Sequence, residues 1–404
     1  MSGMGFGLLA AAFAAPFLTL ACAADPEPLM DPPVVIALGS AEGVPAESVL
    51  YATIRARDGQ IDEAVSYGVG TSEEVRFGSA SVRLAPAALD VLSTIEHFVF
   101  PWHDLHKTKP AEAGDVLAEL EVALAATPAQ DLLVYVHGTK VAFDLPISRA
   151  AELQHFGGRR FATIAFDWPA HSNIFAYAFG PDRQRAIDAA HPLAQLLDWL
   201  AEHTTAERIH VLAYSAGCET ATFGLAELRA QYPELNATEL RKKLRIANTV
   251  FACGDIEVDQ FIHNLPAIHE LAGRVTVLVS DHDTALLSAE RWMGGRKRLG
   301  DGHSEAELLE QTAILTLPRF QIIDVSLGSA ARGFDIDGHH YWYRHPWVSA
   351  DMLMLLLTDR DAGERGLARG PWHQVWMLPA DYPSRLRAAA RALNIPVQPE
   401  SKPE

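Results

Sequence analysis

The feature that most constrains this chain is a series of short, almost purely apolar runs that begins at Leu132. Each run has the length of one strand and is apolar on both of its alternating faces. Strands of this kind occur where a parallel sheet is buried on both sides. The runs are Leu132–Val136, Phe161–Phe166, Ile209–Ala213, Thr249–Cys253, Val275–Val279 and Phe320–Val325. A chain with this pattern must cover both faces of its sheet with other elements.

Helical patterns fill the intervals between these runs. Pro192–His203 places leucines at 193, 196, 197 and 200 on one stripe of a helix. Ala216–Gln231, Val258–Leu271 and Ser304–Leu315 fit the same role. Alternating strands and helices predict an α/β fold, with a mostly parallel sheet flanked by helices and right-handed crossovers between strands.

The segments before Leu132 follow a different pattern. Val49–Ala56 and Glu74–Leu84 alternate apolar and polar residues, which predicts strands of a short antiparallel extension. We therefore predict these divisions of the chain: a leader (1–24), a linker (25–48), one domain (49–390) made of an extension (49–130) and a catalytic core (131–360), and a tail (391–404).

The N-terminus predicts export. Met1–Ala24 has no charged side chain, and Ala21-Cys22-Ala23 is similar to a signal cleavage site. The lack of Lys or Arg before the apolar run, and Pro16 within it, argue against a standard signal. Two alternatives stay open, a lipoprotein acylated at Cys22 and a retained membrane anchor at the N-terminus. Each places the protein in the periplasm, outside the cell or on a membrane.

Charge and cysteine content argue against several kinds of partner. The formal net charge is −18, and nucleic acid is not expected because phosphate binding needs clustered Lys and Arg. The basic stretch Arg291–Arg298 is interpreted as a solvated loop. Cys22, Cys218 and Cys253 have no zinc-ligand spacing, and no glycine-rich phosphate loop follows a strand. We expect no metal and no cofactor. For Cys218 and Cys253 we expect two buried free thiols, with a disulfide between them as the alternative.

One motif joins a predicted strand to a predicted helix. Ala213-Tyr214-Ser215-Ala216-Gly217 follows Ile209–Ala213 directly. A serine in a strand–turn–helix bend is typical of the nucleophile elbow, usually G-x-S-x-G, whose flanking positions must be small. Gly217 satisfies that requirement and Ala213 is the next-smallest choice. Ser215 is therefore the candidate nucleophile, although small-x-Ser-x-Gly also arises by chance in βα turns.

His137-Gly138 stands at the end of an earlier predicted strand. In enzymes with a nucleophile elbow, the loop at this place forms part of the oxyanion hole. Gly138 would let the backbone approach a substrate carbonyl closely. We predict that the N–H groups of Thr139 and Ala216 bind the oxyanion. We interpret His137 as a structural residue, with a second catalytic base as the alternative.

An acid is expected after the serine and before a histidine. The run Val275–Val279 leads into Asp281 and Asp283, which are equally eligible by composition. Further on, a glycine-bearing loop leads to His339 and His340, with His345 as a more distant candidate. A histidine on a loop after the last strand can serve as general base. An aromatic surface loop without catalytic function is the alternative.

The chain resembles a bacterial α/β-hydrolase family of uncharacterised function, usually described as enzymes of the esterase/lipase superfamily. The resemblance extends from about Val49 to Asp351. Its marks are Tyr51-Ala52-Thr53 with Arg55, Phe77–Val82, Val136-His137-Gly138, Phe166-Asp167-Trp168-Pro169, Arg208–Val211 before Ser215, Gly254-Asp255-Ile256, Ser280–Leu286 and Gly338-His339-His340-Tyr341.

The resemblance implies an α/β-hydrolase fold and a Ser-Asp-His triad. The family pattern of a carboxylate before a small residue and Ala-Leu selects Asp283, and its Gly-His-x-Tyr pattern selects His339. Two departures are present: the family usually has His-Ser-Met-Gly where this chain has Tyr214-Ser215-Ala216-Gly217, and it usually has Ser-Trp-Pro where this chain has Asp167-Trp168-Pro169.

We therefore expect a serine hydrolase that acts on a small-molecule ester or lipid-like substrate through an acyl-enzyme. The alternatives are a non-catalytic binding or scaffold protein on a hydrolase fold, and an acyltransferase or peptidase that uses the same triad.

Overall fold

The computed structural model describes residues 44–61, 64–85, 88–101, 114–173, 176–177, 179–292, 294–304, 317–326 and 338–397. The predicted leader with Cys22, the linker up to residue 43, the predicted helix Ser304–Leu315 after its first residue, and the tail from residue 398 lie outside these ranges. Among the described helices, none has both the length and the apolar composition needed to cross a bilayer.

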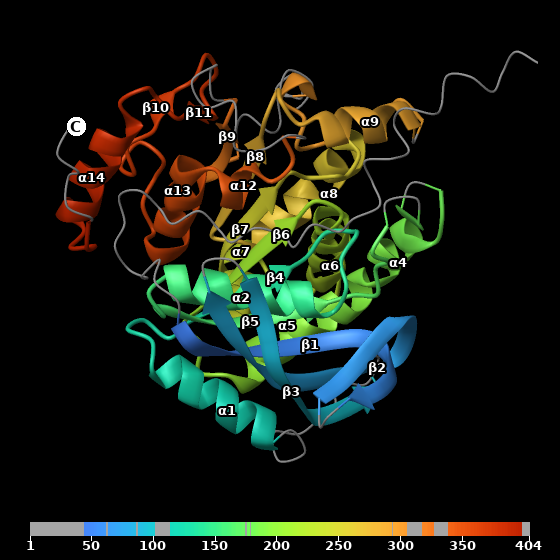
Figure 1. The fold of residues 1–404 in the computed structure, drawn as a ribbon. Helices are drawn as coiled ribbons and strands as arrows, with labels where there is room; N and C mark the ends of the chain where they lie inside the picture. The colour runs from blue at the N-terminus through green and yellow to red at the C-terminus, as the bar shows by residue number, and fades with distance from the viewer. Residues whose placement is uncertain are drawn as a thin grey trace, which may run out of the picture.

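The described strands form one sheet with the order β10-β11-β9-β8-β7-β6-β4-β5-β1-β2-β3 (Figure 1). Neighbours from β11 to β1 are parallel, whereas β10 at one edge and β2 and β3 at the other pair antiparallel. The strands are β1 (Val44–Ile61), β2 (Ala64–Ala85), β3 (Ala88–Pro101), β4 (Asp131–Val136), β5 (Phe161–Asp167), β6 (Arg208–Tyr214), β7 (Ile246–Ala252), β8 (Arg274–Val279), β9 (Phe320–Asp324), β10 (Ala368–Arg369) and β11 (Val375–Met377).

The predicted core runs coincide with β4 to β9, except that Cys253 and Val325 lie one residue beyond the ends of β7 and β9, and the predicted α/β-hydrolase fold is confirmed. Strands β4, β5 and β8 are buried over their whole length. The cause is burial of both faces: Val134 and Val136 belong to one hydrophobic cluster, and Leu133 and Tyr135 belong to another. Successive residues of a strand point to opposite faces, so both clusters are needed.

Helices cover the two faces of the sheet (Figure 1). Residues of α1, α5, α6 and α8 pack in the first cluster, and residues of α2, α13 and α14 pack in the second. The helices are α1 (Gly114–Ala125), α2 (Asp144–Phe156), α4 (Asp182–Asp188), α5 (Ala190–His203), α6 (Gly217–Ala230), α7 (Ala237–Leu244), α8 (Val258–Leu271), α9 (Thr284–Trp292), the short η2 (Gly302–Ser304), α12 (Tyr341–Arg344), α13 (Pro346–Leu357) and α14 (Tyr382–Ala392).

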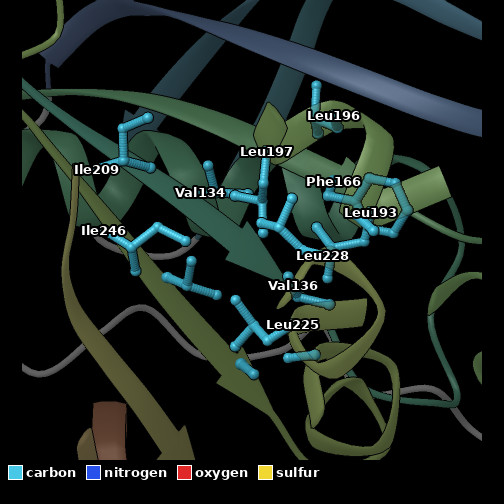
Figure 2. Close-up of a cluster of buried hydrophobic side chains, with 14 of the residues drawn as sticks. Val134, Val136, Phe166, Leu193, Leu196, Leu197, Ile209, Leu225, Leu228 and Ile246 are labelled. Carbon is cyan, nitrogen blue, oxygen red and sulfur yellow. The ribbon is translucent and has the colours of Figure 1, made fainter. Parts of the chain in front are cut away.

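The leucine stripe predicted between 192 and 203 is the buried face of α5. Figure 2 shows Leu193, Leu196 and Leu197 beside Leu225 and Leu228 of α6, packed on the strands that carry the candidate site. These leucines are at most 1% exposed. Truncating one of them to alanine should cost about 2–5 kcal/mol, because the surrounding core cannot collapse fully into the space left behind.

The N-terminal strands continue the central sheet. Strand β1 pairs in parallel with β5, with Thr53 opposite Asp167, and antiparallel with β2. The predicted strands Val49–Ala56 and Glu74–Leu84 lie inside β1 and β2. The predicted domain boundaries stay a prediction, although β1 begins at Val44 and α14 ends at Ala392. The pairing of β1 with β5 brings residues of the extension to the edge of the candidate site.

Candidate active site

Ser215 occupies a sharp bend between β6 and α6. Its φ of 53° lies in the left-handed region, which costs a residue with a side chain about 1–3 kcal/mol. Neighbouring backbone holds the bend. The N–H of Ser215 donates to the carbonyl of Ala252 at 3.0 Å, and its own carbonyl accepts from Cys218 and Asp255 at 2.9 and 3.2 Å. Ser215 therefore stands at the carboxyl end of β6, directly before the first turn of α6.

The bend requires small residues on either side. A Cβ at Gly217 would lie 2.6 Å from the carbonyl oxygen of Val136 and would also collide with the carbonyl of His137. Ala213 is fully buried in the core. The requirement for small residues at these positions is thus a packing requirement in this chain.

Ser215, His339 and Asp283 form a continuous chain of hydrogen bonds. The Nε2 atom of His339 lies 2.8 Å from Ser215 Oγ. Its Nδ1 lies 2.8 and 3.0 Å from the carboxylate oxygens of Asp283. Because a carboxylate accepts hydrogen bonds, the ring proton belongs on Nδ1, and Nε2 presents its lone pair to the serine hydroxyl.

Asp283 and His339 come from two different segments of the chain. Asp283 follows β8, is fully buried, and accepts from the N–H of Leu286 at 3.0 Å in the first turn of α9. His339 precedes α12 and keeps 13% of its side chain exposed. Gly338 has a φ of +68°, and a Cβ there would collide with the carbonyl of His282. The glycine lets the histidine loop pass close to the loop of the acid.

The other candidate residues lie elsewhere. Asp281 is exposed, and its N–H donates to Ser326 Oγ at 2.8 Å. The ring of His340 packs against the rings of His339 and Tyr343. His345 caps α13 instead: its Nδ1 accepts from the N–H of Trp347 at 3.2 Å. The structure therefore brings Asp283 and His339 to Ser215, the pair that the family pattern selects.

The predicted oxyanion loop passes next to the serine. A Cβ at Gly138 would lie 2.8 Å from Ser215 Cβ and 3.3 Å from Ser215 Oγ. Thr139 follows at the turn, where Lys140 has a φ of 65°. Ala216 is the N-terminal flanking residue of α6 and is fully buried. Backbone from the ends of β4 and β6 thus meets around the hydroxyl, where partial positive charge of a helix N-terminus is also available.

A buried ion pair contacts the segment that follows Gly138 and Thr139. Arg55 in β1 and Asp167 at the end of β5 are 1% and 0% exposed, and Arg55 Nε lies 3.0 and 2.9 Å from the two carboxylate oxygens. The terminal nitrogens of Arg55 donate to the carbonyls of Val141 at 3.1 Å and Ala170 at 3.0 Å. Burial alone would raise the pKa of Asp167, but the charge of Arg55 and hydrogen bonds from its neighbours hold it below the usual value.

His137 belongs to the same support. Its Nδ1 donates to the carbonyl of Gly138 at 2.6 Å, and its Nε2 accepts from the N–H of Trp168 at 3.0 Å. The two rings stack with centroids 5.1 Å apart. These contacts fix the direction of the chain as it leaves β4 toward Thr139.

Two side chains hold the backbone of His339. Cys253 Sγ donates to the carbonyl oxygen of His339 at 2.9 Å, and Tyr214 Oη donates to the same oxygen at 3.4 Å. The N–H of Cys253 donates to Tyr341 Oη at 3.2 Å, and that hydroxyl donates to the carbonyl of Leu278. Tyr214, one of the departures from the family pattern, therefore packs against the histidine loop.

The interpretation of Arg291–Arg298 as a solvated loop is wrong for its last residue. Arg298 is fully buried, 3.4 Å from Asp255. Arg296 is 62% exposed and pairs with Glu257 at 2.8 Å. The buried guanidinium of Arg298 thus lies beside the buried carboxylate of Asp255, whose N–H donates to the carbonyl of Ser215. Sequence alone cannot separate the two arginines, since both lie in one polar stretch.

Hydrogen bonding of this kind activates a hydroxyl for attack on an acyl carbon. The sequence profile of the family described as alpha/beta hydrolase of unknown function (DUF900) matches residues 113–360. This chain belongs to that family. The hydrolase has no match among curated proteins. Family membership supports hydrolytic activity and leaves the substrate open.

Two solved structures are similar to the hydrolase. A lipase-esterase related protein from Clostridium acetobutylicum ATCC 824 is 8% identical, with a TM-score of 0.30, over 57% of this chain and 95% of its own. The rice cell wall degrading esterase LipA from Xanthomonas oryzae, in a ligand-bound form, is 10% identical, with a TM-score of 0.24, over 87% of this chain and 95% of its own.

Sequence reasoning did not assign a function to several residues that contact this site. The resemblance includes Arg55 and Asp167 without giving either a role, and the sequence predicts Cys253 only as a core thiol. Tyr214 was noted only as a departure. The parallel register of β1 on β5, which places Thr53 opposite Asp167, is the information that the linear sequence lacks.

Proposed function

We propose that this protein is a serine hydrolase that cleaves carboxylic esters through an acyl-enzyme. Ser215 is the nucleophile, His339 the general base and Asp283 the acid that orients the base. The observation that carries the proposal is the hydrogen-bonded order Asp283–His339–Ser215, with 2.8 Å between His339 Nε2 and Ser215 Oγ. Such an order at a strained bend is difficult to explain by packing alone.

The reaction follows from this geometry. Ser215 Oγ attacks the acyl carbon while its proton passes to Nε2 of His339. Asp283 stabilises the imidazolium and keeps the proton on Nδ1. The alcohol leaves with the proton from Nε2, and water then attacks the acyl-serine, using the same base.

The oxyanion that forms during both steps needs donors fixed in advance. We assign the N–H groups of Thr139 and Ala216 to this function. Close contact between Gly138 and Ser215 supports the assignment. Loss of one such donor typically costs about 10²–10³ in kcat.

We assign a small-molecule ester or a lipid-like ester as the substrate. An alkoxide is a better leaving group than an amide nitrogen, so an ester demands less of the general acid than a peptide bond does.

We further propose that the protein is exported. Its N-terminus would then be a cleaved leader, an end lipidated at Cys22, or a membrane anchor. Truncation of residues 1–24 followed by cell fractionation tests this: retention in the cytoplasm is expected, and unchanged export would contradict it.

A matched pair of chromogenic substrates tests the catalytic proposal. The same acyl group would be offered as a nitrophenyl ester and as a nitroanilide to wild type, Ser215→Ala, His339→Gln and Asp283→Asn. We expect ester cleavage by wild type, and kcat lower by about 10⁴-fold or more in each variant. Equal ester cleavage by Ser215→Ala would refute the nucleophile. Preference for the anilide would favour a peptidase, and inactivity of folded wild type on both substrates would favour a binding protein.

A further inference from the structure

The thiol of Cys253 donates a hydrogen bond to the carbonyl oxygen of His339, the proposed base. Cys253 follows β7 with a φ of 50° and is fully buried. Its backbone N–H and its Sγ are both engaged by the histidine segment, through Tyr341 Oη and the carbonyl of His339. The thiol is thus held at a fixed place beside the base.

Three different ligand types converge at this point. The sulfur of Cys253, a carboxylate oxygen of Asp283 and a ring nitrogen of His339 all lie within 4.8 Å of one another. They come from three separate segments, after β7, after β8 and before α12. Thiolate, imidazole and carboxylate are the ligands of tetrahedral zinc, whose bonds of about 2.0–2.3 Å separate neighbouring ligands by roughly 3.5 Å.

We propose that Cys253, Asp283 and His339 form an inhibitory binding site for Zn²⁺. The proposal rests on the catalytic function proposed for Asp283 and His339. The site is distinct from a catalytic zinc site, because its ligands are the groups that activate the serine. Metal binding and hydrolysis are therefore mutually exclusive.

Inhibition follows from the tautomer of His339. We assign Nδ1 as the ligand, because this nitrogen already contacts the carboxylate of Asp283. A metal on Nδ1 takes the lone pair there, so the ring proton moves to Nε2. Nε2 faces Ser215 and can then no longer accept its proton. The Cys253 thiol releases one proton to solvent as the metal–sulfur bond forms, so zinc binds more tightly as pH rises.

The spacing of cysteines in the sequence could not indicate such a site. Zinc motifs are recognised in a sequence because their ligands lie close together along the chain. Cys253, Asp283 and His339 are far apart in the sequence. Access is through His339, because Cys253 and Asp283 are fully buried and His339 retains 13% exposure. We therefore expect inhibition to develop slowly after zinc is added.

The first test measures labelling of Ser215 by a fluorophosphonate probe with and without Zn²⁺. The variant is Cys253→Ser, and the control is Cys218→Ser, which removes the other described buried thiol. Each rate is compared with the metal-free rate of the same protein. Zinc should slow wild type and Cys218→Ser, and a chelator should restore them.

In Cys253→Ser the zinc concentration for half-inhibition should rise by more than about 100-fold, since even groups that only orient a ligand contribute about 10–100-fold. Equal zinc sensitivity of Cys253→Ser and Cys218→Ser would overturn the proposal.

The second test does not depend on catalysis. Cd²⁺ bound to a thiolate gives an ultraviolet charge-transfer absorption, which would be recorded for the full chain as wild type, Ser215→Ala, Cys218→Ser and Cys253→Ala. The band should be present in the first three proteins and reduced in Cys253→Ala. Its absence from folded wild type would overturn the metal site. Failure of metal-free wild type to label would instead refute the proposed function, and the cadmium band would still test the metal site.

Discussion

The guanidinium of Arg55 lies across the carboxylate of Asp167, with Nε 3.0 and 2.9 Å from its two oxygens. From this position Arg55 also binds the carbonyl of Val141, two residues after Thr139. A strand of the N-terminal extension is thereby connected to the loop that carries a proposed oxyanion donor. We propose Arg55 as a positioning residue, because its contact with the proposed site is made through that loop.

Substitution of Arg55 tests this connection. The variant Arg55→Lys keeps the positive charge. A lysine ammonium cannot bind the carboxylate of Asp167 and the carbonyls of Val141 and Ala170 at the same time. We predict a fall in kcat of about 100-fold with little change in KM, since a displaced loop weakens transition-state contacts. The control is Arg57→Lys, in the same strand, whose side chain is 41% exposed. Steady-state ester kinetics give the answer, and wild-type kcat in Arg55→Lys would rule out the positioning role.

Arg55→Gln should also destabilise the fold. Removing one partner leaves the Asp167 carboxylate buried without its counter-charge, at a cost of about 3–5 kcal/mol. Chemical denaturation of Arg55→Gln and of Arg57→Gln would measure the difference. Equal free energies of unfolding would show that Asp167 finds compensation elsewhere.

Gly138 is predicted to tolerate no side chain. The added methyl of Gly138→Ala would lie 2.8 Å from Ser215 Cβ and 3.2 Å from the carbonyl of Tyr214, so the serine or the loop must move. We expect kcat to fall by about 100-fold or more and stability by about 1–3 kcal/mol. Gly114→Ala is the matched control, because a Cβ there meets nothing within 4 Å. An active Gly138→Ala would contradict the close approach.

His345 predicts a pH dependence of stability. Burial lowers the pKa of His345 to about 4, and its neutral Nδ1 accepts from Trp347 at the start of α13. The unfolded chain therefore binds a proton at higher pH than the folded chain does. The contribution of neutral His345 to the free energy of unfolding is fully present above about pH 6.5. It is lost as pH falls toward 4, and the loss amounts to up to about 3 kcal/mol.

The variant His345→Asn retains a capping acceptor but does not titrate in this range. Its free energy of unfolding, measured by denaturant between pH 4 and 7, should fall less steeply than that of wild type. Parallel curves for the two proteins would show that His345 is not the responsible group.

The sequence predicts the fold well because the decisive signals are local. Apolar runs become buried strands, and the leucines at 193, 196 and 197 form the buried face of α5. The elbow at Ser215 can be recognised for the same reason, since strand, turn and helix are adjacent in the chain. Helix α2 was not predicted: its apolar positions are interrupted by buried polar residues such as Arg149 and Glu152.

The remaining parts of the site depend on long-range contacts. Spacing alone could not choose Asp283 over Asp281 or His339 over His340, because loop paths decide which side chain turns toward Ser215. The ion pair of Arg55 and Asp167 joins residues more than a hundred positions apart. Its existence depends on the register of β1 against β5, which no local pattern contains.

The central claim, that Ser215 is activated by His339 and Asp283, is tested most directly by fluorophosphonate labelling of purified metal-free protein. Wild type should be labelled at a single serine, Ser215→Ala should not be labelled, and His339→Gln should label much more slowly because the hydroxyl has lost its base. Circular dichroism of each protein establishes that it is folded. Undiminished labelling of Ser215→Ala, or a folded wild type that never labels, would contradict the claim.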